Sequence, residues 1–260
     1  MTWHRYVALG DSFTEGVGDP CGDPGGDPGG DPGDLVGWAD RLAGELRRAQ
    51  GALDYANLAV RGKLLQQVVD EQVPAALALA PDLVSIVAGG NDLLRPGADP
   101  DALAAVMEAA VVRLRGAGAD VLLATGVDPR ATPLIGRTRG RSATYNAHLW
   151  SIAARHGARV LDQWGAAWVH DPRMWDVDRL HLAPEGHRRT ALAAAAVLGV
   201  DVEPGWAVPL DPAPALPRRA RLAAEVAWVR SFVVPWVGRR VRGRSSGDGR
   251  TAKRPQLQPV

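Results

Sequence analysis

Short apolar runs alternate with longer amphipathic stretches over residues 5–199, and this alternation limits the chain to one class of fold. Apolar runs of strand length stand at 5–9, 53–60, 82–88, 120–125 and 158–162. Stretches with apolar residues at helical spacing lie between and after them, among them 34–49, 63–80, 99–118 and 183–199. Pro74 is expected to kink or split the helix at 63–80. Strands that alternate with helices favour a parallel sheet with helices on both faces. Such a sheet binds ligands at the carboxyl ends of its strands.

Polar or small residues follow three of the predicted strands. Ser12 follows the first strand, Gly62 the second and Asn91 the third. Because the carboxyl ends of parallel strands share one edge of the sheet, we expect these residues to lie close together. A serine between a strand and a helix is also a common helix cap, so Ser12 alone does not establish a nucleophile.

A histidine that could activate this serine precedes the last predicted helix. A serine hydroxyl attacks esters when a base takes its proton and a third group orients that base. His181 stands three residues after Asp178 in the stretch DVDRLH. This spacing lets the carboxylate reach Nδ1 of the imidazole and leaves Nε2 for the serine. The alternative is a helix-start histidine beside a charge. His187 is predicted to lie on the surface of the last helix.

Two further groups could stabilise an oxyanion. Hydrolysis of an ester through a tetrahedral intermediate needs hydrogen-bond donors aimed at the developing charge. The side chain of Asn91 in VAGGNDLL and the backbone N–H of Gly62 in NLAVRGKLL are the candidates. The alternatives are an Asn-Asp turn at the first position and a glycine with positive φ at the second.

Four blocks, taken together, resemble the SGNH, or GDSL-like, hydrolases. They are GDSFTEG at 10–16, the glycine in AVRGKLL, GGND at 89–92 and DRLH at 178–181. The resemblance covers roughly residues 5–199 and implies a flavodoxin-like three-layer α/β/α sandwich with a central parallel five-stranded sheet. It implies Ser12 as nucleophile, His181 as general base and Asp178 as the residue that orients it. It also implies an oxyanion hole formed by the N–H groups of Ser12 and Gly62 and the side chain of Asn91.

The implied activity is the hydrolysis of carboxylic esters through an acyl-enzyme on Ser12, without a cofactor. Esterase and lipase-like substrates, including acylated small molecules or sugars, fit this chemistry. The same serine, histidine and aspartate serve an acyltransferase equally well, so that alternative stays open. The chain departs from the family at Phe13, where the family name has leucine, and at Leu182, where many members have proline. It has no Gly-x-Ser-x-Gly elbow, which disfavours an α/β-hydrolase.

A Gly-Asp-Pro repeat at 18–34 invites a calcium-loop interpretation. Calcium loops place ligands at alternating positions and close the shell with a bidentate acid. Here the aspartates mostly stand four residues apart, and each precedes Pro or Leu, so a flexible insertion is favoured. Asp11 and Asp92 are predicted to bind loop N–H groups rather than a metal. No cluster has zinc spacing, and we expect no metal site.

The composition changes beyond the predicted catalytic domain at 1–200. A proline-rich connector at 201–217 precedes an amphipathic helix at 218–242, interrupted at Pro235, and a polar tail at 243–260 that is predicted to be disordered. From Arg218 to Arg254 there are ten Arg and one Lys against two acidic residues. We expect the apolar face of the helix to pack on the domain, with peripheral membrane contact as the alternative. A non-catalytic protein that binds a membrane or a partner through this helix is the competing function, and no nucleic-acid partner is expected.

The remaining features concern the compartment. The single cysteine, Cys21, excludes an intramolecular disulfide and suits a reducing environment. The first residues, MTWHRYVALGDS, lack an apolar signal region, and no apolar stretch is long enough to span a membrane. We therefore expect a cytoplasmic protein whose partner is a small-molecule ester.

Overall fold

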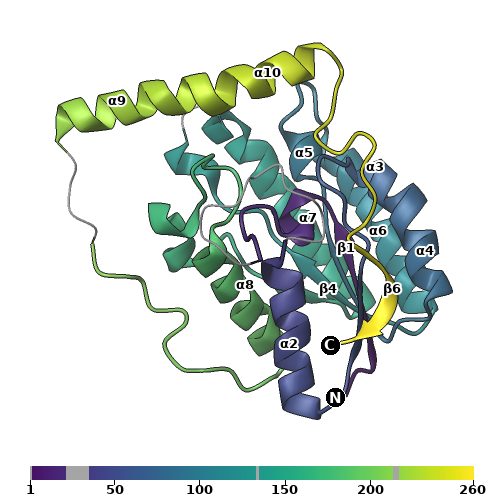
Figure 1. Ribbon diagram of the computed structural model, residues 1–260. Helices are drawn as coiled ribbons and strands as arrows, with labels where there is room; N and C mark the ends of the chain where they lie inside the picture. The colour runs from purple at the N-terminus through teal and green to yellow at the C-terminus, as the bar shows by residue number, and fades with distance from the viewer. Residues whose placement is uncertain (1, 22–34, 133–134, 213–216) are drawn as a thin grey trace.

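A six-stranded sheet runs through the centre of the computed structural model, which describes residues 2–21, 35–132, 135–212 and 217–260 (Figure 1). The strands lie in the order β5-β4-β3-β1-β2-β6. Their bounds are Arg5–Gly10 (β1), Asp54–Asn57 (β2), Leu83–Val87 (β3), Asp120–Ala124 (β4), Arg159–Leu161 (β5) and Arg254–Pro259 (β6). The first five strands pair in parallel, and β6 is antiparallel to β2.

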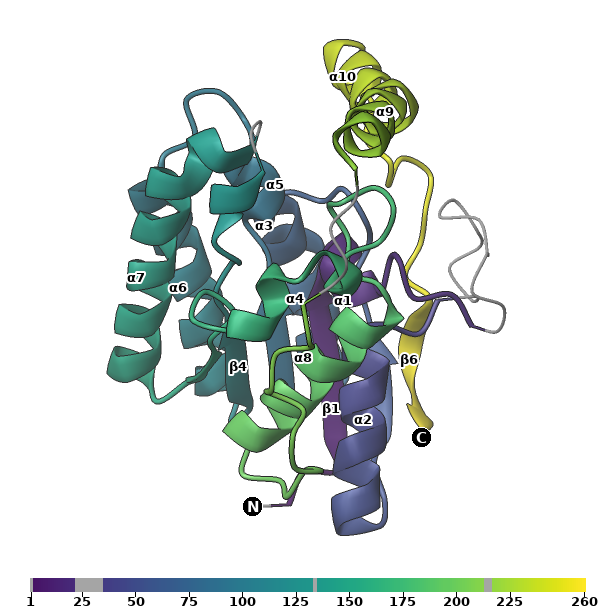
Figure 2. The same cartoon turned by 90° about the vertical axis from the view of Figure 1, so that its left-hand side faces the viewer.

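Helices cover both faces of this sheet, which confirms the predicted three-layer α/β/α architecture (Figure 2). One face packs against α2 (Gly37–Gln50) and α8 (Pro184–Val197). The other packs against α3 (Leu65–Gln67), α4 (Val73–Ala78), α6 (Pro100–Gly116) and α7 (Arg139–His156). Side chains of β1 alternate between the two cores, as the two-residue period of a strand requires: Val7 and Leu9 enter one, and Tyr6 and Ala8 the other.

Short elements fill the carboxyl edge of the sheet. The short helix α1 (Ser12–Glu15) follows β1, and α5 (Gly90–Leu93) follows β3. Four 3-10 turns occupy the loops after β4 and β5, at Pro129–Ala131, Ile135–Thr138, Ala167–His170 and Pro172–Met174. The predicted strands therefore end where the candidate site residues begin.

Both prolines predicted to interrupt helices follow a π-helical turn. The predicted helix at 63–80 is divided into α3, a π turn at Val68–Gln72, and α4, with Pro74 in the first turn of α4. The C-terminal helix consists of α9 (Arg218–Trp228), a π turn at Val229–Val233 and α10 (Val234–Val241), whose second residue is Pro235. Proline lacks an N–H and its ring displaces the carbonyl four residues earlier, so the looser π turn accommodates it without ending the helix.

The C-terminal helix packs on the domain through only part of its apolar surface. Its aromatic side chains Trp228, Phe232 and Trp236 are half-buried. Val229 and Val237 of the same predicted face stay exposed, as do Leu222 and Val226 before them, so the expected burial of this face is only partial. Within the described part of the chain, no helix has both the length and the apolar character that crossing a membrane requires.

The polar tail at 243–260, predicted to be disordered, contains the sixth strand. β6 pairs with the edge strand β2, with Asp54 opposite Pro259 and Tyr55 opposite Gln258. The prediction of a five-stranded sheet and a disordered tail is wrong for this segment because main-chain hydrogen bonds and one buried lysine hold it, and an apolar pattern reveals neither. An edge strand offers such bonds to any extended segment that reaches it.

The predicted flexible insertion, together with its calcium-loop alternative, falls largely on residues 22–34 and lies outside the described residues. Asp19, at its start, is described and buried. Its carboxylate accepts hydrogen bonds from the backbone N–H of Gly37 at 3.0 Å and from Nε and Nη2 of Arg41 at 2.8 Å each. Asp19 therefore joins the start of the insertion to α2.

Candidate active site

Ser12 is the first residue of α1, immediately beyond β1. Asp11 caps this short helix by accepting a hydrogen bond from the backbone N–H of Phe13 at 3.2 Å. The Ser12 side chain is half-buried at the carboxyl edge of the sheet, where the strand pattern places it.

The two aspartates beside the site bind loop N–H groups, as predicted. The carboxylate of Asp11 is buried and also accepts a hydrogen bond from Nδ2 of Asn91 at 3.1 Å. Burial raises the pKa of Asp11 to about 6. Asp92 accepts a hydrogen bond from the backbone N–H of Leu65 at 3.0 Å. Within the described residues, no group of three or more His, Cys, Asp or Glu side chains is arranged to hold a metal ion.

Asp178 and His181 form a hydrogen-bonded pair in the loop before α8. Oδ2 of Asp178 lies 2.5 Å from Nδ1 of His181. Oδ1 of the same carboxylate accepts the backbone N–H groups of Leu180 at 2.8 Å and His181 at 2.9 Å. Burial acts to raise the pKa of Asp178, but its hydrogen bonds to His181 and Leu180 and the charge of the imidazole together outweigh burial and hold the pKa below the ordinary value. The carboxylate is therefore ionised and fixed in orientation.

Asn91 is placed by a glycine that no other residue could replace without strain. Gly89 caps α5 with φ of 105°, and a Cβ there would lie 2.9 Å from the ring of Tyr145. The Tyr145 hydroxyl donates a hydrogen bond to the carbonyl of Ala88 at 3.2 Å. The Asn91 amide donates to Asp11 and to the carbonyl of Lys63 at 3.0 Å. Asn91 thus joins the loops after β1, β2 and β3.

Gly62 lies in the loop after β2 with φ of 75°. A buried ion pair that the sequence reasoning did not identify fixes this loop to α1. Nη2 of Arg61 lies 2.9 Å from Oε1 of Glu15, and the Arg61 backbone N–H donates to Oε2 at 2.6 Å. Both side chains are almost fully buried. The only available signal was their position, since each stands inside or beside one of the blocks that carry Ser12 and Gly62.

The structure brings the histidine loop onto the helix that carries Ser12. Phe13 packs against the small apolar cluster that contains Leu182. Within the described residues, no hydrogen bond joins Oγ of Ser12 to the imidazole of His181. Catalytic hydrogen bonds are often long in unliganded enzymes and tighten when substrate binds. The candidate residues thus lie beyond the carboxyl ends of the strands. Ser12 and Asn91 are in the short helices α1 and α5, and Gly62, Asp178 and His181 are in loops.

His187 is buried, and the prediction of a surface position is wrong. Its Nδ1 accepts the backbone N–H of Trp38 and its Nε2 donates to the carbonyl of Val17, each at 3.1 Å. Burial lowers the pKa of His187 to about 4. The neutral imidazole therefore joins α8 to the turn after α1 and to the start of α2.

The C-terminal helix contacts the loop that carries Asp178 and His181. Nε1 of Trp228 donates a hydrogen bond to the Asp178 carbonyl at 2.9 Å. Nη1 of Arg179 lies 2.7 Å from Oε1 of Glu225, and its guanidinium lies 4.9 Å from the ring of Trp228. Arg179 has φ of 57°, a left-handed conformation that is uncommon for arginine. Contacts from α9 therefore hold this residue between Asp178 and His181.

Known proteins resemble this chain over most of the predicted catalytic domain. The model of the GDSL-like Lipase/Acylhydrolase family matches residues 8–189. The uncharacterized protein YpmR of Bacillus subtilis (strain 168) is 34% identical over 95 residues, which span 34% of this chain and 32% of YpmR. The matched stretch is thus about a third of that protein.

Two solved structures show the same fold. The crystal structure of TesA matches with a TM-score of 0.58 at 23% identity, covering 75% of this chain and 98% of TesA. The structure of Axe2, an acetylxylan esterase from Geobacillus stearothermophilus, matches with a TM-score of 0.62 at 20% identity, covering 77% of this chain and 96% of Axe2. At these identities the likeness establishes the fold.

Proposed function

Because the chain belongs to the GDSL-like lipase/acylhydrolase family, a family of carboxylic ester hydrolases, we propose that it cleaves esters through an acyl-enzyme on Ser12. The observation that carries this proposal is the fixed pair of Asp178 and His181. One carboxylate oxygen engages Nδ1 of the imidazole and the other is held by two backbone N–H groups. Nε2 is therefore the nitrogen available to take a proton from Ser12.

The reaction proceeds in two displacements. As Oγ of Ser12 attacks the ester carbonyl, His181 takes the hydroxyl proton on Nε2, and ionised Asp178 stabilises the imidazolium. The C–O bond of the tetrahedral intermediate then breaks, and the alcohol leaves with the proton from Nε2. Water repeats the attack on the acyl-enzyme with His181 again as base, and this step releases the acid and restores Ser12.

The backbone N–H groups of Ser12 and Gly62 and the amide of Asn91 are the proposed donors to the oxyanion. The Asn91 amide already donates to Asp11 and to the Lys63 carbonyl. An oxyanion must therefore share or displace one of these bonds. A preformed donor of this kind typically contributes a factor of about 10²–10³ to kcat.

Simple esters and acetylated sugars are the substrate classes to test first. Axe2, a structural neighbour, is an acetylxylan esterase, and its catalytic mutants change a serine and a histidine. We propose that this chain hydrolyses esters of small acyl groups, tested with p-nitrophenyl esters of increasing acyl length beside acetylated sugars. An activity that falls steeply beyond acetate would support a deacetylase.

The decisive experiment compares two serine variants. Ser12→Ala is expected to lower kcat for p-nitrophenyl acetate by about 10⁴-fold or more, as removal of a triad member does in the serine protease template. Ser151→Ala is the matched control, because this serine is exposed on α7 and its hydroxyl bonds only its own helix at the Ala147 carbonyl. A fluorophosphonate should label the wild type and Ser151→Ala, but not Ser12→Ala. Near-full activity in a folded Ser12→Ala variant would refute the proposal.

A further inference from the structure

The C-terminal helix presents a row of aliphatic side chains to solvent. The row consists of Leu222, Val226, Val229, Val234 and Val237, which are exposed by 67%, 51%, 41%, 59% and 43%. It spans α9, the π turn and α10. The aromatic residues of the same helix are half-buried, and one of them, Trp228, bonds the Asp178 carbonyl. Soluble proteins rarely keep an aliphatic row of this length uncovered, because burying each such side chain is favourable.

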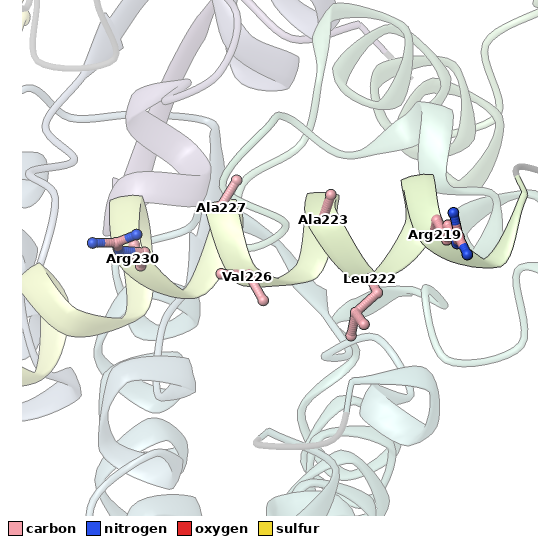
Figure 3. Close-up of a pocket in the computed structure, with 6 residues that line it drawn as sticks. All are labelled: Arg219, Leu222, Ala223, Val226, Ala227 and Arg230. Atoms are coloured by element: carbon pink, nitrogen blue, oxygen red, sulfur yellow. The ribbon is translucent and has the colours of Figure 1, made fainter.

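Arginines flank the first part of this row on the same face. A shallow groove on α9 is lined by Arg219, Leu222, Ala223, Val226, Ala227 and Arg230. In Figure 3 the two arginines stand at opposite ends of the apolar residues along the helix. Arginine can lay its aliphatic stem along an apolar surface while its guanidinium reaches polar groups above it. The face is therefore apolar in its middle and cationic at both ends.

The charge of the helix points to an anionic partner. Residues 218–242 contain seven arginines and one acidic residue, Glu225. That glutamate is already paired with Arg179 of the histidine loop. The sequence of the helix is therefore strongly positive.

The helix also lies over the edge of the sheet that carries the candidate site (Figures 1 and 2). α9 rests on the loop of Asp178, and beyond α10 the hydroxyl of Ser245 donates to the Gly62 carbonyl at 3.2 Å. The loop of Asp178 also exposes two apolar side chains, Val177 at 66% and Leu180 at 38%. A surface that receives the outer face of the helix would therefore lie next to the site.

We propose that the outer face of α9–α10 docks on an anionic lipid membrane. An amphipathic helix with an aliphatic row and flanking arginines is the pattern of a helix that lies in the plane of a membrane surface. Single-stranded nucleic acid is recognised by stacking on exposed aromatic rings, whereas Trp228 and Trp236 are half-buried. The docking surface is independent of the proposed chemistry, and it brings the site to esters held at a membrane.

The test is co-sedimentation of the full chain with vesicles of phosphatidylcholine alone or mixed with phosphatidylglycerol. We expect binding to the mixed vesicles, with little binding to phosphatidylcholine alone and weaker binding at high salt. Arg219→Ala with Arg230→Ala should lower the affinity by about 25-fold, since each arginine contributes about fivefold at an anionic surface. Leu222→Glu with Val226→Glu should lower it by more than about tenfold. Val112→Glu is the matched control, because Val112 is an exposed valine on α6.

Three outcomes would overturn the proposal. The first is a chain that does not sediment with either vesicle. The second is a Leu222→Glu, Val226→Glu variant that binds vesicles like the wild type. The same holds if this variant differs from the wild type only in being a monomer where the wild type is a dimer. The third is equal binding to RNA that competes with the vesicles, which would assign the charge to nucleic acid. Each variant should keep its hydrolysis of p-nitrophenyl acetate in solution, and Ser12→Ala should still bind vesicles, so failure of the chemistry and failure of the docking are separable.

Discussion

Lys253 offers the sharpest test of how the C-terminal segment is held. It lies one residue before β6 and its side chain is only 4% exposed. Its Nζ donates hydrogen bonds to the carbonyls of Leu35 at 3.0 Å and Val36 at 2.6 Å and lies 2.5 Å from Oδ2 of Asp40. One ammonium thus satisfies two carbonyls and a carboxylate at the start of α2.

Replacing Lys253 by Met keeps the aliphatic stem and removes the charge. Removing one partner of a buried pair costs about 3–5 kcal/mol because the other charge is left uncompensated. The Asp40 side chain retains 22% exposure, so the lower end, about 3 kcal/mol, is expected. For a chain of this size that loss lowers the melting temperature by roughly 6–12 °C.

Circular dichroism melts of the full chain measure this effect. Arg48→Met is the matched control on α2, since Arg48 is paired with Glu45 at the surface and should change the unfolding free energy by less than about 1 kcal/mol. The double variant Lys253→Met, Asp40→Asn should recover part of the loss, because it removes the orphaned charge. A Lys253→Met variant that melts with the wild type would show that the tail does not hold the start of α2, and the described packing of β6 would be refuted.

Three further predictions test the site and its support. Asp178→Asn should lower kcat for p-nitrophenyl acetate by about 10⁴-fold with the fold intact, as in the serine protease template, and a loss below tenfold would contradict the orienting role. The unfolded chain takes up the histidine proton at its ordinary pKa of about 6.5 and folded His187 at about 4, so the unfolding free energy should fall by about 3 kcal/mol as the pH drops through that window. Urea titrations at several pH values give the unfolding free energies of the wild type and of His187→Gln. The difference between the two should change with pH, and a constant difference would contradict the prediction. Gly89→Ala should displace Tyr145 and Asn91, lowering both kcat and stability, and unchanged kinetics would contradict the placement of Asn91.

The sequence was sufficient for the layers of the fold and for placing the candidate site residues at the ends of strands. Strands β1 to β5 are short apolar runs that end at glycine or polar residues, and such runs can be recognised in a sequence as buried strands. The four blocks then placed Ser12, Gly62, Asn91 and the Asp178–His181 pair at strand ends or before α8. These patterns are local in the sequence, so they can be recognised without knowing which distant segments come into contact.

The features that the sequence did not reveal are all long-range. Glu15 and Arg61 look like ordinary surface charges until the loop after β2 folds over α1. His187 has charged neighbours that suggest a surface helix, yet its own position faces Trp38 and Val17. β6 has a polar composition, and its register depends on which edge of the sheet is free. Each of these three features depends on a contact with a residue at least 46 positions away in the sequence.

The segments beyond the family match, from residue 190 onward, change what the site at the sheet edge can reach. An edge strand is exposed to association with other chains, and β6 covers the edge of β2. The same segment returns from α10 across Gly62 and anchors at Lys253, so the C-terminal helix is tied to loops of the candidate site at Trp228, near its middle, and at Ser245, beyond its C-terminal end. A helix tied in this way cannot leave the site without breaking the contacts at Asp178 or Gly62. Substitutions on its outer face should therefore change the binding of the enzyme to vesicles. Substitutions on its inner face should change kcat.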